Sequence, residues 1–448
     1  MYDNFHLPPF RRYKARFSKD ELVELEQADK FRVCAPRCGV KAFCVPEWNK
    51  TPPRKRGIFW PDINAVIPKS ALMKDYIPRK DEVRRKCAES LYSRQFDLQS
   101  FYDQLPLHPE ISPLFSVDGK SCLASLPMGF RPSAEVAQCV TVAMTDFQLP
   151  EGVNCVVYID NIRFGGPSKA AVNKACETFL ARIEKCGAVL NEFESEPSTS
   201  EDFLGEHYNL RKKRRRLTDK ILEKLKIADE LVGQQLTFRQ VSAMFGLVFF
   251  CSDVLELDIC KYFIALRFYR RCMASVSQWD DPAPPIDPAA SANLTVWIKE
   301  ARANKSIPLW NDSKTFFPDL TIFSDASAVG WGAVAISNSG VRHFSGRWTA
   351  AEASAGIEHS TKAEPLAVQR AAFSAVSTNC RQVLIMSDHQ GLVFAGNAGY
   401  GKSEAYNSMC ATLKSAFPET KFKFGFIAGI ENTVADRLSR NPEFHETE

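Results

Sequence analysis

Apolar runs separated by polar turn residues in the second half of the chain predict an α/β domain. Three apolar runs separated by Gly, Asn and Ser have the composition of strands: LTIFSDAS from Leu320, then GWGAVAIS, then VRHFSGRW. An Ala-rich helix over 365–377, a strand RQVLIMSD, a strand KFKFGFI and a closing helix NTVADRLSR follow in order. This order predicts a mixed five-stranded sheet with helices packed on it.

The first half reads as a separate mixture of strands and helices. GIFWPDINAVI and NCVVYIDNIRFGG are apolar enough for strands, and SKAAVNKACETFLARIEKCG is an amphipathic helix with Gly187 as its C-cap. DKILEKLKIADELVG and TFRQVSAMFGLVFFCSDV predict further helices. The proline-rich stretch over 279–293 predicts a linker, since proline disrupts helix interiors and central strands, and LTVWIKEARAN after it predicts a short amphipathic helix.

Composition narrows the class of protein. The 448 residues are 45% hydrophobic and 25% charged, which suits a globular chain of two to four domains. No apolar run approaches the length of a membrane span, and the N-terminal stretch lacks the apolar core of a signal peptide. The 14 scattered cysteines predict reduced thiols, and hence a cytoplasmic or nuclear location.

Positive charge is concentrated in the first half. Residues 276–448 carry 15 Lys/Arg and 18 Asp/Glu, and the other 42 Lys/Arg and 35 Asp/Glu lie in residues 1–275. The excess is clustered at 11–16, 54–56, 84–86 and 211–216. Such clusters suit a polyanionic partner such as nucleic acid, although each alone is equally compatible with a solvated surface.

Two aspartates in the first half are candidates for metal binding. Asp97 lies in RQFDLQSFYDQLPLHPE, and Asp160 lies at the tip of the apolar strand VVYIDNIRF. Carboxylates at strand ends suit Mg²⁺, and paired ions can activate an attacking hydroxyl and stabilise a leaving phosphate oxygen. On spacing alone, Asp97 could instead cap a helix and Asp160 could occupy a turn.

An ordered set of segments resembles the palm motifs of reverse transcriptases. The segments are FDLQSFYDQLPLHPE, LPMGFRPSAEVAQ, YIDN, GAVLNEF and DFLGEHYNL, and upstream KRGIFWPDIN and YIPRKDEV are similar to fingers segments. The resemblance covers about residues 50–275. It implies an α+β right-hand polymerase of fingers, palm and thumb.

The resemblance also implies roles for individual residues. Asp97, Asp160 and the backbone carbonyl of Leu98 would bind metal, Tyr102 would be the steric gate that selects deoxynucleotides, and Lys55 or Arg56 would hold the incoming triphosphate. The segment Leu126–Gln138, which includes Met128, would shape the nucleotide pocket and brace the template. Phe203, Leu204 and Gly205 would open the primer-grip hairpin.

Three positions depart from the family pattern. Asn161 replaces the second aspartate of the Y-x-DD motif, and a neutral amide oxygen binds a cation more weakly. Met128 stands where Gln or Phe is commoner, and NEFES lacks the lysine that usually follows LN. The first of these departures leaves open a rival hypothesis, in which the polymerase is weak or dead and acts as a nucleic-acid-binding scaffold.

Four acids in the second half occupy positions that can converge at one sheet edge. Asp325 and Asp388 end strands, Glu364 lies near the start of the Ala-rich helix, and Asp436 lies in the last helix. Converging carboxylates repel unless cations neutralise them. Thr361 to Glu364 also fits a capping box, although Pro365 fits better at the first helical position.

This half resembles ribonuclease H of the retroelement type. SDAS followed by GWGA, the D…E…D…D order and ADRLSR carry the resemblance, which implies that Asp325, Glu364, Asp388 and Asp436 bind metal and cleave RNA. The family histidine near the last aspartate has no clear counterpart, and His389, which follows Asp388 in sequence, is not assigned a catalytic role.

Two further signals are ambiguous. Cys34, Cys38 and Cys44 have no histidine at zinc-knuckle spacing, so ordinary thiols are favoured over a metal site. The run Arg211, Lys212, Lys213, Arg214, Arg215 and Arg216 could grip the primer–template backbone, act as a nuclear import signal or be a solvated hairpin.

Together these features predict a retroelement reverse transcriptase with a fused ribonuclease H. The expected partners are an RNA template, a DNA primer, RNA/DNA hybrid and deoxynucleoside triphosphates, with two Mg²⁺ ions per site, or Mn²⁺ in their place. With no D-[ST]-G protease motif and no integrase after ADRLSR, tyrosine-recombinase (DIRS/VIPER-type) elements are favoured over gypsy-like ones. A stand-alone RNA hydrolase whose first half positions the hybrid is a further alternative.

The expected boundaries follow the same resemblance. They are an N-terminal extension over 1–49, fingers and palm over 50–210, a thumb over 211–278, a linker or connection over 279–318 and a ribonuclease H domain over 319–448.

Overall fold

The computed structural model forms two compact units. It describes residues 7–13, 18, 23, 25–47, 54–73, 77–191, 193, 195–310, 316–354, 357 and 359–442. Unit 1 comprises Met1–Phe203, His207–Arg214 and Pro308–Trp310, and unit 2 comprises Leu204–Glu206, Arg215–Ile307 and Asn311–Glu448. The boundary between them falls in a sheet of order β11-β10-β9-β8, made of β8 (Ser200–Phe203), β9 (Glu206–Asn209), β10 (Arg214–Leu217) and β11 (Ile307–Pro308).

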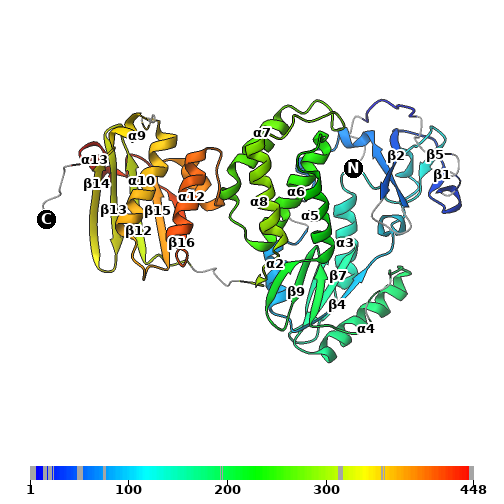
Figure 1. Ribbon diagram of the computed structural model, residues 1–448. Helices are drawn as coiled ribbons and strands as arrows, with labels where there is room; N and C mark the ends of the chain where they lie inside the picture. The colour runs from blue at the N-terminus through cyan, green and yellow to red at the C-terminus, as the bar shows by residue number, and fades with distance from the viewer. Residues whose placement is uncertain are drawn as a thin grey trace. The chain divides into compact units, whose positions relative to one another are not determined.

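The centre of unit 1 is a three-stranded antiparallel sheet of order β4-β7-β6. Its strands are β4 (Tyr92–Asp97), β6 (Asn154–Tyr158) and β7 (Asn161–Gly166), so the apolar run over 154–166 is a hairpin (Figure 1). Helices α3 (Ser133–Thr145) and α4 (Lys169–Cys186) pack on one face, where the rings of Phe96 and Phe179 lie 5.1 Å apart. The predicted C-cap of α4 is confirmed, since Gly187 has φ 65°.

A second small core in unit 1 is built on short strands. The hairpin β2 (Val40–Glu47) and β3 (Arg54–Pro61) packs near β1 (Phe31–Val33), which pairs with β5 (Ser121–Leu123). Short 3₁₀ segments lie at Asp62–Ala65, Lys69–Ala71, Phe101–Gln104 (η3) and Ser112–Leu114, and α2 spans Lys80–Ala88.

A disulfide joins Cys34 to Cys122 in this part of unit 1. The two cysteines are 88 residues apart in sequence, but the pairing of β1 with β5 brings their Cα atoms to 6.1 Å. The prediction that all cysteines are reduced thiols is therefore wrong for this pair. Cys38, the next cysteine of the ambiguous trio, is a buried thiol.

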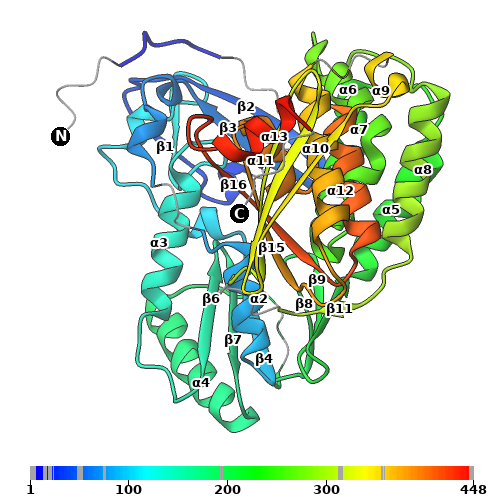
Figure 2. The ribbon, with the colours of Figure 1, turned by 90° about the vertical axis from the view of Figure 1, so that its left-hand side faces the viewer.

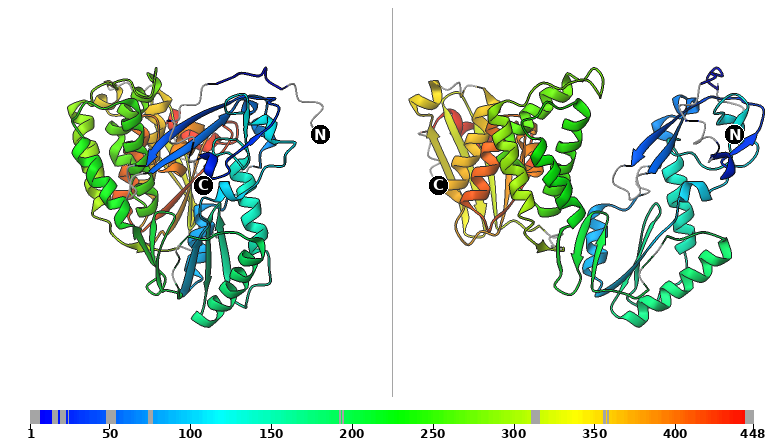
Figure 3. Two further views of the ribbon diagram at one scale, coloured as in Figure 1. Left: turned by 90° about the vertical axis from the view of Figure 1, so that its right-hand side faces the viewer. Right: turned by 45° about the vertical axis from the view of Figure 1, so that its right-hand side comes forward.

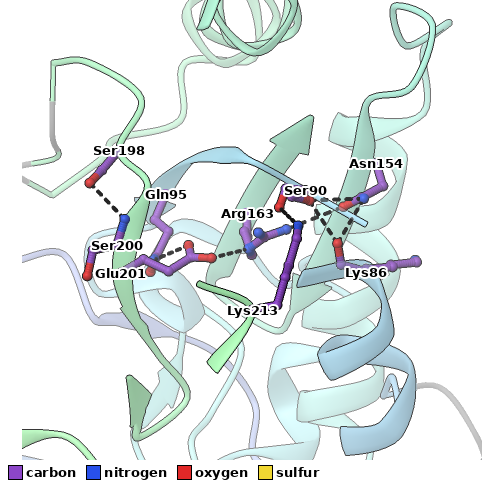
Figure 4. A network of polar contacts seen from close by, with 9 residues as sticks. All are labelled: Lys86, Ser90, Gln95, Asn154, Arg163, Ser198, Ser200, Glu201 and Lys213. Carbon is purple, nitrogen blue, oxygen red and sulfur yellow. Dashed lines mark hydrogen bonds and ion pairs between the residues drawn. The ribbon is translucent and has the colours of Figure 1, made fainter. Parts of the chain in front are cut away.

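The face of the unit 1 sheet opposite α3 and α4 carries a polar network (Figure 4). Arg163 of β7 is fully buried, and its Nε donates to Oε1 of Glu201 on β8 at 2.8 Å. Gln95 of β4 donates to the other oxygen of Glu201, also at 2.8 Å. Asn154 of β6 accepts from Nη1 of Arg163 at 3.3 Å, so Arg163 and Glu201 together link the three strands of the sheet.

Unit 2 begins with a group of helices that lie side by side (green in Figure 3). They are α5 (Asp219–Leu231), α6 (Phe238–Leu255), α7 (Phe263–Ala274) and α8 (Pro288–Arg302), with a 3₁₀ turn at Ile259–Tyr262. Trp297 is fully buried among them, donates to Oγ of Ser252 at 2.7 Å and stacks on Tyr262.

Helix α8 differs from the expected linker. It starts within the proline-rich stretch, because Asp287 accepts from the N–H of Ala290 as N-cap and Pro288 takes the first helical position, where its missing N–H costs nothing. The helix extends to Arg302 and its apolar side packs into the core around Trp297.

Within the described residues, α6 is the one helix long and apolar enough to cross a membrane, judged by length and composition. Half of that stretch is buried in the structure. Its buried side chains pack in the core that α6 shares with α5, α7 and α8, as those of a core helix do.

The rest of unit 2 contains the predicted mixed five-stranded sheet, of order β14-β13-β12-β15-β16 (Figures 1 and 2). Its strands are β12 (Leu320–Ala326), β13 (Gly330–Ser337), β14 (Gly340–Arg347), β15 (Gln382–Ser387) and β16 (Lys421–Phe426). The pair β12–β15 is parallel, whereas β12–β13 is antiparallel. The helices are α9 (Ala350–Ser354), α10 (Ser360–Ala375), α11 (Gln390–Ala398), α12 (Glu404–Ala416) and α13 (Thr433–Arg440).

Helices cover the two faces of this sheet differently. Ile322, Ala333 and Ile385 share a core with α10 and α12. On the other face, α13 lies so close to β13 that any side chain larger than that of Gly332 would meet Leu438. Pro365 lies inside α10, not at its first position, so that expectation was wrong.

The buried Arg163–Glu201 pair predicts a large stability effect. Replacing Glu201 with Ala leaves the Arg163 charge buried without its counter-ion, and we expect a loss of about 3–5 kcal/mol. The measurement is urea unfolding followed by hydrogen-exchange mass spectrometry of peptides over 92–97 and 161–166. Glu89→Ala is the control: it breaks the half-exposed pair with Arg85, which should cost about 0.5 kcal/mol or less. Equal losses in the two variants would contradict the prediction.

Candidate functional site

Two carboxylates meet at one end of the unit 1 sheet. Asp97 is the last residue of β4 and lies opposite Asn161, the first residue of β7. Asp160 precedes Asn161 in the turn of the β6–β7 hairpin, and its carbonyl oxygen accepts from the N–H of Leu98 at 3.0 Å. The two aspartates predicted from the sequence are thus on adjacent strand ends, joined by a backbone hydrogen bond.

The electrostatics of this pair reflect burial and mutual repulsion. Burial raises the pKa of Asp160, and the negative charge of Asp97 raises it further. The Asn161 amide, which donates to Oδ1 of Asp160 at 2.9 Å, and the Arg56 guanidinium act in the opposite direction on that pKa. A divalent cation would relieve the same repulsion, so the donor set fits Mg²⁺.

Asn191 was missed as a site residue. Its side-chain amide donates to Oδ2 of Asp97, and its backbone N–H donates to the carbonyl oxygen of Asp97 at 2.8 Å. In the sequence, Asn191 is the asparagine of the LN pair in GAVLNEF. That segment carried part of the resemblance, but no role was predicted for this asparagine. Each carboxylate of the pair therefore accepts from an asparagine.

The residues expected to meet the nucleotide lie on several elements. Arg56 is exposed on β3, and its Nη1 is 3.9 Å from the sulfur of Met128. The backbone of Met128 is held by the N–H of Phe59, which donates to its carbonyl at 2.8 Å. Tyr102 lies half-buried in η3, packed against both cores of unit 1. The side chain of Lys55 lies outside the described residues.

Gln138 and Leu98 are placed inside the protein. Gln138 is 4% exposed, and both polar atoms of its amide are bonded to the backbone of the β6–β7 hairpin. The role in shaping the nucleotide pocket expected for Gln138 stays a prediction. The Leu98 side chain is 1% exposed, and metal binding by its carbonyl stays a prediction.

The turn after β8 contains the Phe203-Leu204-Gly205 segment. Phe203 is buried, whereas Leu204 and Gly205 adopt φ of 50° and 84°. A side chain at Gly205 would meet the ring of Phe250 on α6. These two turn residues also line an apolar cavity of about 580 Å³ together with α5 and α6.

The basic run over 211–216 is not uniformly exposed. Arg215 is 3% exposed, pairs with Glu256 at 2.6 Å and donates to the carbonyl of Val254. Lys213 donates to two carbonyls that follow α2, those of Ala88 and Ser90, at 2.7 and 2.6 Å. The exposed cations Arg211, Lys212 and Arg214 can face a polyanion, and Arg216, partly exposed, lies 3.5 Å from Asp219.

Three carboxylates converge at one edge of the unit 2 sheet. Asp325 on β12, Asp388 just after β15 and Glu364 on α10 each place an oxygen within 4.8 Å of the others. Because β12 and β15 are parallel neighbours, their ends meet at the same edge. Asp436 is not part of this group and instead binds Arg440, whose Nε and Nη2 lie 2.8 and 2.7 Å from Oδ1.

Burial raises the pKa of two carboxyl groups in this cluster, those of Glu364 and Asp325. Burial, reinforced by the charges of Asp325 and Asp388, raises the pKa of Glu364 to about 9. Burial also raises the pKa of Asp325 to about 6, with Asp388 and Asp436 adding to the effect. Among the described residues, Oε2 of Glu364 is buried without a hydrogen-bond partner. A buried acid cluster with an unsatisfied oxygen fits a divalent cation.

Ser439 and His389 were not assigned roles from the sequence, and the structure gives them different ones. The hydroxyl of Ser439 donates to Oδ2 of Asp325 at 2.6 Å. Ser439 is the serine of the ADRLSR segment that carried part of the resemblance. His389 caps α11, because its Nδ1 accepts from the N–H of Leu392 at 3.2 Å.

The sequence matches no protein-family model and no curated protein. Solved structures do match in fold. The foamy viral protease-reverse transcriptase in complex with double-stranded DNA matches 95% of this chain and 87% of its own, with a TM-score of 0.51 and 14% identity. The same protein in complex with an RNA/DNA hybrid matches 93% of this chain and 55% of its own, with a TM-score of 0.52 and 14% identity.

A third match is a form of that protein designated dRH, bound to double-stranded DNA. It covers 94% of this chain and 74% of its own, with a TM-score of 0.50 and 14% identity. At this identity the likeness is one of fold. The coarse expectation of a reverse-transcriptase-like fold with a mixed five-stranded sheet is therefore supported.

Proposed function

We propose that this chain is a reverse transcriptase with a fused ribonuclease H, from a retroelement. One observation carries the proposal: a single chain with this fold holds two separate acid clusters at strand ends, one in each unit. Unit 1 would supply fingers and palm, the helices α5 to α7 the thumb, and the sheet of unit 2 the ribonuclease H domain. The tyrosine-recombinase (DIRS/VIPER-type) subgroup stays our preferred origin.

The partners follow from the same proposal. The solved structures that share the fold are complexes with double-stranded DNA and RNA/DNA hybrid, which supports a nucleic-acid partner for this chain. An RNA template, a DNA primer and deoxynucleoside triphosphates would be its substrates. Tyr102 would stand beside C2′ of the nucleotide and exclude ribonucleotides, and Arg56 would meet the triphosphate.

Divalent cations would be held by Asp97 and Asp160 in unit 1 and by Asp325, Glu364 and Asp388 in unit 2, with Asp436 completing the second set. Mg²⁺ bound at such sites supplies Lewis-acid stabilisation of developing charge and activates the attacking oxygen. The chain's own contribution is orientation: Asn191 holds Asp97, and Ser439 holds Asp325. Glu364 must lose a proton before it binds a cation, because burial raises its pKa to about 9.

A second candidate function rests on Asn161. Its amide donates to Asp160, so this position adds no negative charge to the pair. A weak or dead polymerase that acts as a scaffold for nucleic acid, with an active ribonuclease H, remains the alternative. Primer extension by the unaltered chain in Mg²⁺ and in Mn²⁺ separates the two, since a dead polymerase extends no primer with either metal and a weak one extends it only slowly.

The two activities should be separable. Asp97→Asn or Asp160→Asn should lower DNA synthesis by at least about a hundredfold, the scale on which a lost electrostatic stabiliser acts, and spare hybrid cleavage. Asp388→Asn should do the reverse. Primer extension and cleavage of a labelled RNA/DNA hybrid are measured on the same preparations. Cleavage that survives Asp388→Asn would show that the unit 2 site is wrongly assigned.

The metal-free stability of unit 2 should fall as pH rises. A carboxyl whose pKa is raised by folding binds more protons in the folded state, so its stabilising contribution is present at low pH and is lost as pH approaches about 9 for Glu364. The slope should be at most about 1.4 kcal/mol per pH unit for one group. Thermal unfolding of the full chain in EDTA, from about pH 5 to 9, measures it.

Glu364→Gln tests the origin of this slope. The variant should unfold at a higher temperature than the wild type at about pH 8, and with a flatter pH dependence, because no charge has to be buried. Glu419→Gln, which alters an exposed pair with Arg381, is the control and should retain the wild-type slope. A wild-type slope in Glu364→Gln would exclude this residue as the cause.

The exposed cations of the basic run should determine how strongly the affinity for a hybrid duplex depends on salt. If Arg211, Lys212 and Arg214 contact phosphates, replacing all three with Gln should flatten the slope of log affinity against log salt by about two to three. Hybrid-duplex affinity is measured across a salt series, with Lys169, Lys174 and Lys185 of α4 replaced as the control. An unchanged slope would exclude the role in gripping the primer–template backbone. In that case, an altered location of the variant in cells would favour a nuclear import signal. If neither the slope nor the location changed, the run would be a solvated hairpin.

A further inference from the structure

The turn that presents Asp160 contains a disfavoured backbone conformation. Ile159 has φ 58°, in the left-handed region that β-branched residues rarely adopt. It lies between Tyr158, the last residue of β6, and Asp160. Whatever holds Ile159 in this conformation also determines the direction in which the chain enters Asp160.

Two side chains of α3 hold the peptide groups on both sides of this residue. Oε1 of Gln138 accepts from the N–H of Ile159 at 2.6 Å, and Nε2 of Gln138 donates to the carbonyl of Val157 at 3.0 Å. Oγ1 of Thr141 donates to the carbonyl of Ile159 at 2.6 Å. Gln138 and Thr141 are three residues apart, so they lie on one face of the helix.

The two side chains that make these bonds are buried, and the bonds to the peptide groups of Ile159 are partly buried. Gln138 is 4% exposed and Thr141 is fully buried. The Ile159 side chain packs against the core formed by α3, α4 and the sheet, which favours its retention at this position. From the other side, the N–H of Leu98 donates to the carbonyl of Asp160. The hairpin tip is therefore fixed by α3 on one side and by the chain after β4 on the other.

We infer that Gln138 and Thr141 are positioning residues that hold Ile159 in its left-handed conformation and thereby keep the Asp160 carboxylate beside Asp97. The activity readouts for this inference rest on the proposed polymerase function. The bonds belong to unit 1, so hybrid cleavage in unit 2 is an internal control. A role confined to general folding would lower DNA synthesis and hybrid cleavage together. It would leave the Mg²⁺ requirement of DNA synthesis unchanged.

Gln138→Met tests the inference, because it keeps the volume of the side chain and removes its amide. We expect kcat for primer extension to fall about ten- to a hundredfold, which corresponds to leaving buried partners of a hydrogen bond unpaired. The Mg²⁺ concentration for half-maximal synthesis should rise, and KM for the nucleotide should change less than kcat. Thr141→Val should act in the same direction.

Thr145→Val is the matched control. Its hydroxyl also lies on α3 but donates to carbonyls of that helix, those of Thr141 and Val142. Synthesis and its Mg²⁺ dependence should match the wild type. Equal defects in Gln138→Met and Thr145→Val, or a parallel loss of hybrid cleavage, would overturn the inference.

Ile159→Gly separates positioning from simple packing. Glycine adopts the left-handed conformation without strain, so Gln138→Met should be less harmful to synthesis in the Ile159→Gly background than in the wild type. An effect of the same size in both backgrounds would contradict the inference, because the clamp would then not act through the conformation of Ile159.

A structural readout keeps the inference testable if the wild type makes no DNA, which would defeat the proposed function alone. Hydrogen exchange in peptides over 154–166 should be faster in Gln138→Met and Thr141→Val than in the wild type, and unchanged in Thr145→Val. Unchanged exchange in the first two variants would overturn the inference whatever the activity of the chain.

Discussion

Repulsion between carboxylates held at neighbouring strand ends is the constraint on which both candidate sites depend. The two units compensate for this repulsion in different ways. In unit 1 the acids remain surrounded by donors, since Asn191 binds Asp97 and Asn161 binds Asp160. In unit 2 Asp325 and Glu364 are buried, Asp388 is partly exposed, and the pKa of Glu364 rises to about 9, so that a proton takes the place of a counter-ion. The second site is therefore the one whose charge state changes most when a cation binds.

The sequence was most informative where one local rule decides the outcome. The strands of unit 2 and the mixed character of their sheet followed from apolar runs bounded by turn residues, and α4 ended at Gly187 as its C-cap signal predicts. Of the four acids expected to converge at one edge, Asp325, Glu364 and Asp388 lie together there, whereas Asp436 is not part of the group. In unit 1, the apolar pattern over 154–166 was interpreted as a single strand, whereas it is a hairpin whose turn at Ile159 no local propensity favours.

What the sequence could not supply were contacts between distant residues. Cys34 and Cys122 are 88 residues apart, and only the pairing of β1 with β5 makes them neighbours. The six cations over 211–216 look alike in sequence, yet Arg215 is buried beside Glu256, a partner 41 residues away. The start of α8 was missed for a different reason: the prolines around 282–288 were taken as helix breakers, whereas Pro288 follows an N-cap aspartate and opens a helix.

The hydrogen bond between Ser439 and Asp325 has a consequence for the order of assembly during synthesis. The two residues are 114 positions apart, and α13 packs on β13 next to β12. Because the chain emerges from the ribosome from its N-terminal side, β12 to β15 are available before α13. At that stage Asp325 lacks its hydroxyl partner and Gly332 lacks the helix that covers it. The acid cluster of unit 2 would therefore be completed after most of unit 1 has been synthesised.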